Sequence, residues 1–294
     1  MKLKELRHNF RKGRMCCCCL LALVMLFSLM AVPASAGSDT SIKKHAKYYE
    51  EPEFKSYDGT PLYVRESGSG PLLLLIHGAA TDADFWHDAG DYLSQHFHVI
   101  SYDRRGYVRS GFTKNSDDIL TAHAKDAYAL IQRFGNGQPA YVIGHSLGGP
   151  VAMKLAELHP EVIQKLMLFE PVTESDRYFQ QTDPSVFFPP LKQTDPRGRA
   201  ATDEESANVL PDTLALKYDK DIILNYRVPY DALKNLDVLF AVGEDSKGTL
   251  IYNETLRMAQ TLNKPVIYYP GVHNSAFDFP EQFSTITTKA FLNQ

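Results

Sequence analysis

The chain has 294 residues, of which 44% are hydrophobic and 22% are charged. This composition suits one sizeable globular domain with room for an inserted subdomain. The 35 acidic residues outnumber the 31 basic ones, which gives a formal net charge of −4. A net acidic surface disfavours nucleic acids and anionic membrane surfaces as partners.

The first 36 residues have the pattern of a secretory signal peptide. A basic stretch from Lys2 to Arg14 precedes an apolar stretch from about Cys16 to Val32, and Ala34-Ser35-Ala36 follows. Small residues in this A-x-A arrangement predict cleavage after Ala36 and export to a periplasm or the medium. The alternative is an uncleaved membrane anchor, because an apolar stretch of about 17 residues is at the lower limit for a span.

All four cysteines, Cys16 to Cys19, lie within this N-terminal segment. The exported chain is therefore expected to contain no disulfide, no thiolate metal site and no cysteine nucleophile. The basic residues of the segment would also be lost, so the exported domain is expected to be more acidic than the whole chain.

The rest of the chain alternates between predicted strands and predicted helices. A hairpin is expected first, because Phe54–Tyr57 and Leu62–Glu66 flank Asp58-Gly59. Apolar runs then predict strands at Leu72–Ile76, His98–Tyr102, Ala140–Ile143, Lys165–Phe169, Val238–Val242 and Pro265–Tyr269. Helical spacing predicts helices at 83–96, 117–134, 150–158, 250–262 and 280–292. This alternation predicts an α/β fold with a mostly parallel, doubly wound sheet.

One region interrupts the alternation. Residues 171 to about 234 are rich in proline and phenylalanine and are too long for an ordinary connection. We interpret them as a cap inserted over the sheet edge where ligands bind. The alternative is a surface decoration that does not contact a ligand.

The segment from Gly144 to Gly149 carries the clearest chemical signal. Its sequence, Gly-His-Ser-Leu-Gly-Gly, contains a G-x-S-x-G motif between a predicted strand and a predicted helix. That context is typical of a nucleophile elbow, a sharp turn that presents a serine hydroxyl. A serine needs such a turn beside a base, because its hydroxyl is otherwise a poor nucleophile.

Other landmarks occur in a matching order along the chain. They are His77-Gly78-Ala79-Ala80 after a strand, the turn Tyr102-Asp103-Arg104-Arg105-Gly106, the elbow, Gly243 after a strand, and the loop Pro270-Gly271-Val272-His273. With these landmarks the chain resembles the α/β-hydrolase family over residues 53–294, in its serine-nucleophile branch with a cap insertion. The resemblance implies the α/β-hydrolase fold.

The resemblance also implies a role for several residues. Ser146 would attack a carbonyl carbon, and His273 would take the hydroxyl proton and later protonate the leaving group. The backbone N–H groups of Ala79 and Leu147 would stabilise the developing oxyanion. His77 would shape the oxyanion loop rather than take part in chemistry.

The acid that orients His273 is open between two carboxylates. The family pattern places an aspartate three residues after Gly243, but Ser246 occupies that position. Glu170, at the end of a predicted strand, is our favoured acid, as some relatives place a glutamate there. Asp245 is the alternative, with a shift of one residue.

These features predict an exported serine hydrolase that cleaves an ester or related acyl bond of a small molecule through an acyl-enzyme. Perhydrolase, lactonase and carbon–carbon hydrolase activities of the same fold are alternatives, as is a non-catalytic ligand-binding relative. Serine rather than aspartate at position 146 disfavours epoxide hydrolase and haloalkane dehalogenase chemistry. We expect no metal and no organic cofactor, and no membrane partner unless the N-terminal segment stays uncleaved.

Overall fold

A seven-stranded sheet forms the centre of the computed structural model, which describes residues 54–79, 81–112, 117–172 and 226–292, together with Asp219 and Ile222. The strand order is β3-β5-β4-β6-β7-β8-β9. Only β3 (Val64–Ser67) is antiparallel to its neighbour, β5 (His98–Tyr102). The parallel strands that complete the sheet are β4 (Leu72–Ile76), β6 (Ala140–His145), β7 (Ile163–Phe169), β8 (Val238–Gly243) and β9 (Val266–Tyr269).

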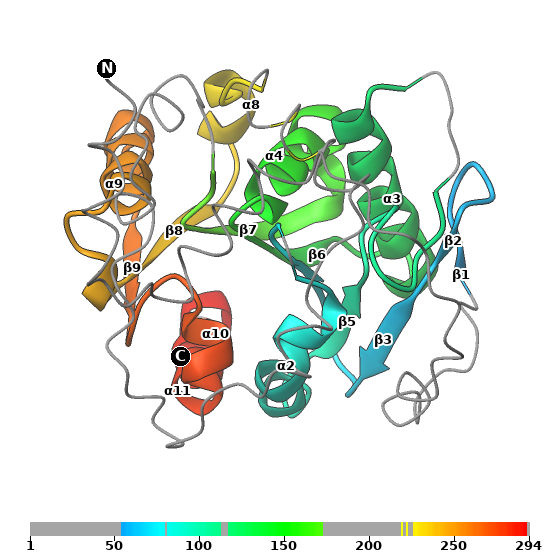
Figure 1. Ribbon diagram of the computed structural model, residues 1–294, viewed down its shortest axis with the longest axis horizontal. Helices are drawn as coiled ribbons and strands as arrows, with labels where there is room; N and C mark the ends of the chain where they lie inside the picture. Colours follow the sequence, from blue (N-terminus) through cyan, green and yellow to red (C-terminus); the bar gives the residue numbers. More distant parts are fainter. Residues whose placement is uncertain are drawn as a thin grey trace, which may run out of the picture.

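Helices cover both faces of the sheet (Figure 1). One face carries α3 (Ile119–Phe134), α4 (Gly148–Leu158), α8 (Tyr230–Lys234) and α9 (Leu250–Leu262). The opposite face carries α2 (His87–Leu93), α10 (Ser275–Asp278) and α11 (Pro280–Leu292). Short 3-10 turns occur at η3 (Ala83–Trp86), η4 (Pro160–Val162) and η6 (Glu244–Ser246).

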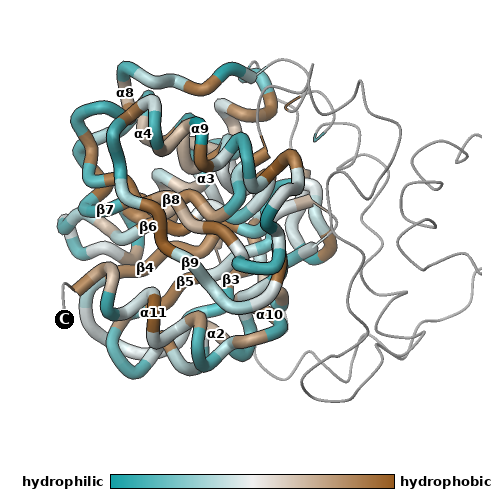
Figure 2. The backbone as a smooth tube through the Cα atoms, turned by 90° about the vertical axis from the view of Figure 1, so that its left-hand side faces the viewer, coloured by the Kyte–Doolittle hydropathy of each residue, from teal (hydrophilic) through white to brown (hydrophobic). Residues whose placement is uncertain are grey.

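Burial on both faces explains the unbroken apolar character of the central strands. Every residue of β4, β6 and β8 is buried, and Figure 2 shows hydrophobic strands between layers whose outer surfaces are more hydrophilic. Side chains alternate between the two faces of a strand, so a strand with a helix layer on each side needs apolar residues at successive positions. The same sheet therefore contributes to two separate cores, one under each helix layer.

The hairpin predicted around Asp58-Gly59 is present as β1 (Phe54–Lys55) paired with β2 (Pro61–Leu62). Gly59 has a φ of 82°, a left-handed conformation that favours glycine in a tight turn. Beyond β2 the chain leaves the hairpin, and Val64–Ser67 joins the large sheet instead.

The predicted helices are found with modest differences at their ends. The segment predicted as one helix at 83–96 is a 3-10 turn followed by α2, which ends at Leu93. The helix after the elbow begins at Gly148, two residues earlier than predicted. The predicted signal peptide, residues 1–36, and most of the predicted cap, 171–234, lie outside the described residues. Among the helices that are described, none has the length and apolarity needed to cross a membrane.

The order of the strands identifies one edge of the sheet as the place for a site. The chain passes from β4 to β5 on one side and then to β6 on the other, so the winding direction changes between β4 and β6. In open α/β sheets, ligands bind at the carboxyl ends of the strands at such a switch point. The loops that follow β4, β6, β7, β8 and β9 all lie at that edge, because these strands are parallel.

Candidate active site

Ser146 lies at the turn between β6 and α4. Its φ of 53° is in the left-handed region, which is unusual for a residue with a side chain. The Ser146 N–H donates to the carbonyl of Phe169 at 3.1 Å, and its own carbonyl accepts from Gly149 N at 2.9 Å. These bonds to β7 and α4 hold the turn in its strained form, as expected of a nucleophile elbow.

Glycines make the elbow possible because the backbone is crowded there. A Cβ at Gly144 would lie 2.6 Å from the carbonyl oxygen of Gly148, and one at Gly148 would lie 2.2 Å from that of Ile76. Gly78, in the loop after β4, approaches the elbow from the other side, and a Cβ there would lie 2.8 Å from the Cβ of Ser146. The glycines therefore allow the loop after β4 to lie in direct contact with Ser146.

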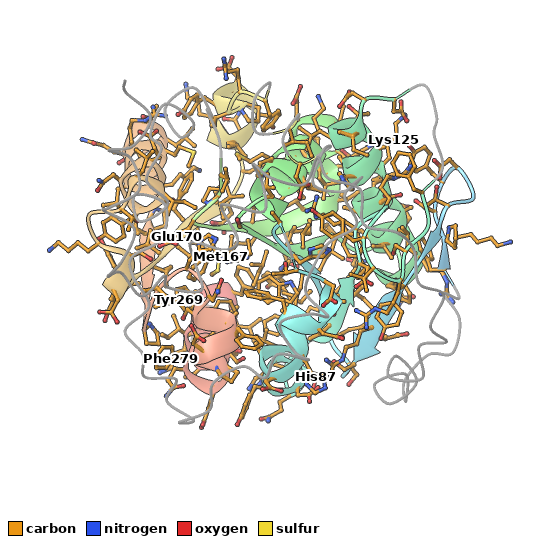
Figure 3. All side chains as sticks on the ribbon, viewed as in Figure 1. His87, Lys125, Met167, Glu170, Tyr269 and Phe279 are labelled. Carbon is orange, nitrogen blue, oxygen red and sulfur yellow. The ribbon has the colours of Figure 1, made fainter. Side chains whose placement is uncertain are left out.

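His273, in the loop after β9, is paired with Glu170. Its Nδ1 lies 2.7 Å from Oε2 of Glu170, whose other oxygen accepts a hydrogen bond from Gly243 N at 3.0 Å. Glu170 follows the last residue of β7, is fully buried and has a φ of 38°. Figure 3 labels it together with Met167 of β7, well apart from His87. The buried carboxylate fixes the proton of His273 on Nδ1 and leaves Nε2 as the basic nitrogen.

Of the two carboxylates considered from the sequence, Glu170 is therefore the one that contacts His273. Asp245 lies in η6 with its side chain exposed, and its backbone N–H donates to Gly271 at 2.8 Å. Ser246, at the position where the family pattern expects the acid, is buried, and its hydroxyl has no hydrogen-bond partner among the described residues.

His145 connects the elbow to the histidine loop. Its Nε2 donates to the carbonyl of His273 at 2.8 Å, and the two rings lie 4.4 Å apart. The His145 ring also stacks on Phe85, with centroids 4.6 Å apart. Burial is the main reason that the pKa of His145 lies well below its usual value. The residue is thus neutral, and it adds no positive charge beside His273.

His77 organises the loop after β4 and is not placed for chemistry. Its Nε2 accepts a hydrogen bond from the backbone N–H of Arg104 at 2.9 Å, so in the neutral ring the proton is on Nδ1. That nitrogen donates to the carbonyl of Gly78 at 2.8 Å. Burial, and secondarily the charge of Arg104, lowers the pKa of His77 well below its usual range, so the ring is neutral at neutral pH.

The predicted oxyanion donors lie on either side of Ser146. Ala79 follows Gly78 in the loop after β4, and Leu147 is the N-cap residue of α4. Neither N–H is donated to an acceptor among the described residues. The N-terminal end of α4 adds a partial positive charge beside Leu147, which favours an anion there. The described residues include no group of three or more histidine, cysteine or acidic side chains that could hold a metal ion.

Comparison with known proteins identifies the family of the chain. The family model described as "alpha/beta hydrolase fold" matches residues 71–280, so the chain belongs to the α/β-hydrolase family. The uncharacterized hydrolase YraK of Bacillus subtilis is similar, with 28% identity over 249 residues that cover 77% of this chain and 90% of the relative. The protein is thus a hydrolase of this fold.

Solved structures with the same fold include two hydrolases. A hydrolase from Pseudomonas aeruginosa aligns with a TM-score of 0.64 and 22% identity, covering 82% of this chain and 97% of that one. A thermophilic esterase from Thermogutta terrifontis aligns with a TM-score of 0.58 and 19% identity, covering 81% and 97%. At these identities the structures establish a shared fold and leave the substrate open.

Proposed function

We propose that this protein is an exported serine hydrolase that cleaves an ester or related acyl bond through an acyl-enzyme on Ser146. The observation that carries the proposal is the buried Glu170–His273 pair, 2.7 Å apart, in the loops beside the strained elbow of Ser146. A carboxylate, a histidine and a serine on an elbow are the three parts of a nucleophilic triad.

The first half of the reaction forms the acyl-enzyme. Nε2 of His273 takes the hydroxyl proton as the Ser146 oxygen bonds to the carbonyl carbon, and the carbonyl electrons move onto its oxygen. When the carbonyl re-forms, the bond to the leaving alcohol breaks, and the imidazolium returns the proton to that alcohol. Glu170 stabilises the imidazolium between these two transfers.

The second half regenerates the enzyme. Water gives a proton to Nε2 of His273 as its oxygen attacks the acyl carbon, and collapse of the intermediate expels the Ser146 oxygen, which takes that proton back. Both intermediates carry a negative oxygen, which the N–H groups of Ala79 and Leu147 would stabilise. One such donor is typically worth on the order of 3 kcal/mol in the transition state.

The test is turnover of p-nitrophenyl esters by residues 37–294, with Ser146→Ala as the matched variant. An enzyme releases many equivalents of nitrophenol, and the variant releases it at the background rate. A ligand-binding relative would release at most one equivalent per chain, and that outcome would reject the proposal.

The part of the proposal that concerns export is supported by the sequence pattern of residues 1–36.

A further inference from the structure

The carbonyl oxygen of Gly78 is held from more than one side by buried side chains. His77 Nδ1 donates to it at 2.8 Å and Arg104 Nη2 at 3.0 Å, while the Thr81 hydroxyl lies 3.4 Å away. A trans peptide is planar, so its C=O and N–H point in opposite directions. The described peptide bonds include no cis bond. Fixing the Gly78 carbonyl therefore also fixes the direction of the Ala79 N–H, a proposed oxyanion donor.

Arg104 is itself held by Asp219, which lies 115 residues further along the chain. Nη1 of Arg104 lies 3.0 Å from Oδ1 of Asp219, and Nη2 lies 3.3 Å from Oδ2. The Tyr107 hydroxyl accepts from Arg104 at 2.7 Å and donates to Asp219. The Arg104 side chain is fully buried and that of Asp219 is 3% exposed. This pair is thus shielded from solvent, where hydrogen bonds to charged groups are strong and directional.

We propose that Asp219 and Arg104 are positioning residues of the oxyanion hole, acting through the Gly78–Ala79 peptide. This inference rests on the proposed function and deepens it. The guanidinium polarises the Gly78 carbonyl, which makes the Ala79 N–H a better donor, and it prevents the peptide from turning away from Ser146. Preorganised donors stabilise a transition state because they need no rearrangement when charge develops.

The neighbouring arginine provides a contrast within the same turn. Arg105 is equally buried, but it pairs with Asp126 at 2.6 Å and with Asp58 at 2.9 Å. These acids lie on α3 and in the hairpin turn, so the Arg105 pair ties the turn to the scaffold. The two arginines thus have different tasks, and Asp126→Asn is a matched control for Asp219→Asn. Both changes remove one negative charge from a buried arginine pair.

The first experiment compares these variants and Arg104→Met as hydrolases of an ester and of its thionoester. Sulfur is a weak hydrogen-bond acceptor, so an oxyanion hole favours the ester. We expect kcat for the ester to fall roughly tenfold or more in Asp219→Asn and Arg104→Met, with KM within about twofold, because a displaced donor loses part of its effect. The ester-to-thionoester rate ratio should fall too. Asp126→Asn should keep the wild-type kcat and the wild-type rate ratio, counted per folded molecule, even if this variant unfolds at a lower temperature.

The second experiment does not depend on turnover. In protein labelled with 15N-alanine, the amide resonance of Ala79 should shift in Asp219→Asn and stay in place in Asp126→Asn. If wild-type protein hydrolyses no ester, the proposed function fails, and the Ala79 resonance still tests the positioning. An unmoved Ala79 resonance, or an unchanged rate ratio in an active Asp219→Asn enzyme, would overturn the inference.

Discussion

Glu170 is a buried carboxylate whose two oxygens have separate partners. One oxygen lies 2.7 Å from Nδ1 of His273, and the other accepts from Gly243 N at the end of β8. The backbone of Glu170 is left-handed, with a φ of 38°. A residue with a side chain pays a conformational cost there, and such strain is common at functional sites.

Glu170→Gln should lower kcat for ester hydrolysis by roughly 10³- to 10⁴-fold, because the glutamine has no charge to stabilise the imidazolium and only one oxygen for two N–H donors, His273 Nδ1 and Gly243 N. Asp245→Asn, at the exposed carboxylate after β8, is the matched variant and should change kcat by less than about threefold. Steady-state kinetics of the two purified variants checks this ranking. The reverse order of losses would transfer the role to Asp245.

The sequence predicts some of these residues more firmly than others, for physical reasons. Ser146 and His273 sit in local motifs whose glycines and prolines constrain the backbone around them. The sequence favours Glu170 over Asp245 only weakly, because the geometry of two loops from different strands decides which carboxylate reaches His273. Asp219 carries no local motif at all, and its pairing with Arg104 depends on a contact across 115 residues.

At the scale of elements, the elbow joins a buried strand to a helix through a single strained residue. Its backbone bonds reach β7 and α4, so two neighbouring elements hold the Ser146 conformation in place. The packing of β6, which is buried throughout, and of α4, most of whose residues are buried, offsets the energy that this conformation costs. The strained backbone of Ser146 is thus a property of the strand–turn–helix unit.

Ser146→Gly should therefore be more stable than Ser146→Ala by about 1 kcal/mol. Both variants remove the hydroxyl, but only glycine adopts a positive φ without a steric cost. Urea unfolding at equilibrium measures the difference in the free energy of unfolding. Equal stability of the two variants, or a more stable alanine variant, would argue that the turn is unstrained.

Most strands and long helices could be predicted from apolar periodicity, whereas short elements could not. The helix α9 agrees with the predicted range 250–262, since its apolar spacing spans more than three turns. The four-residue α10 and the turn η6 are too short to show a period, and packing beside the histidine loop fixes them. The conformation of such short segments is determined by tertiary contacts rather than by local sequence preference.

At the scale of the whole molecule, buried neutral histidines link stability to pH. Burial holds the pKa values of His77, His123 and His145 well below that of an exposed histidine. Below a pH of about 6.5 the unfolded chain binds protons at these positions and the folded protein does not. The neutral form of these histidines therefore contributes fully to the free energy of unfolding above that pH. This contribution is lost as the pH falls below it.

The free energy of unfolding should drop by up to about 4 kcal/mol per pH unit below pH 6 from these three histidines. Asp82 opposes this trend, because burial raises its pKa to about 6 in the folded protein. The folded protein therefore binds a proton at Asp82 more strongly than the unfolded chain does, which adds to stability as the pH falls. Urea unfolding at a series of pH values gives the slope, and His145→Phe should reduce it by about 1.4 kcal/mol per pH unit. A slope that is unchanged by this substitution would mean that His145 is protonated in the folded state.

The proposed cleavage after Ala36 predicts that an exported form of the protein begins at Gly37. Expression of the full chain in a bacterial host, followed by N-terminal sequencing of the extracytoplasmic fraction, checks this prediction. Ala36→Leu should block processing, because the cleavage site requires a small residue at that position. An intact Met1 terminus on membrane-bound wild-type protein would instead favour the uncleaved anchor.

The most direct measurement is labelling of residues 37–294 by a fluorophosphonate, in wild type and Ser146→Ala. This reagent modifies serines that a neighbouring base has activated, so we expect stoichiometric labelling of the wild type at Ser146 and none of the variant. Mass spectrometry of the labelled peptide locates the adduct. Folded wild-type protein that stays unlabelled, or equal labelling of the variant, would contradict the assignment of Ser146 as the nucleophile.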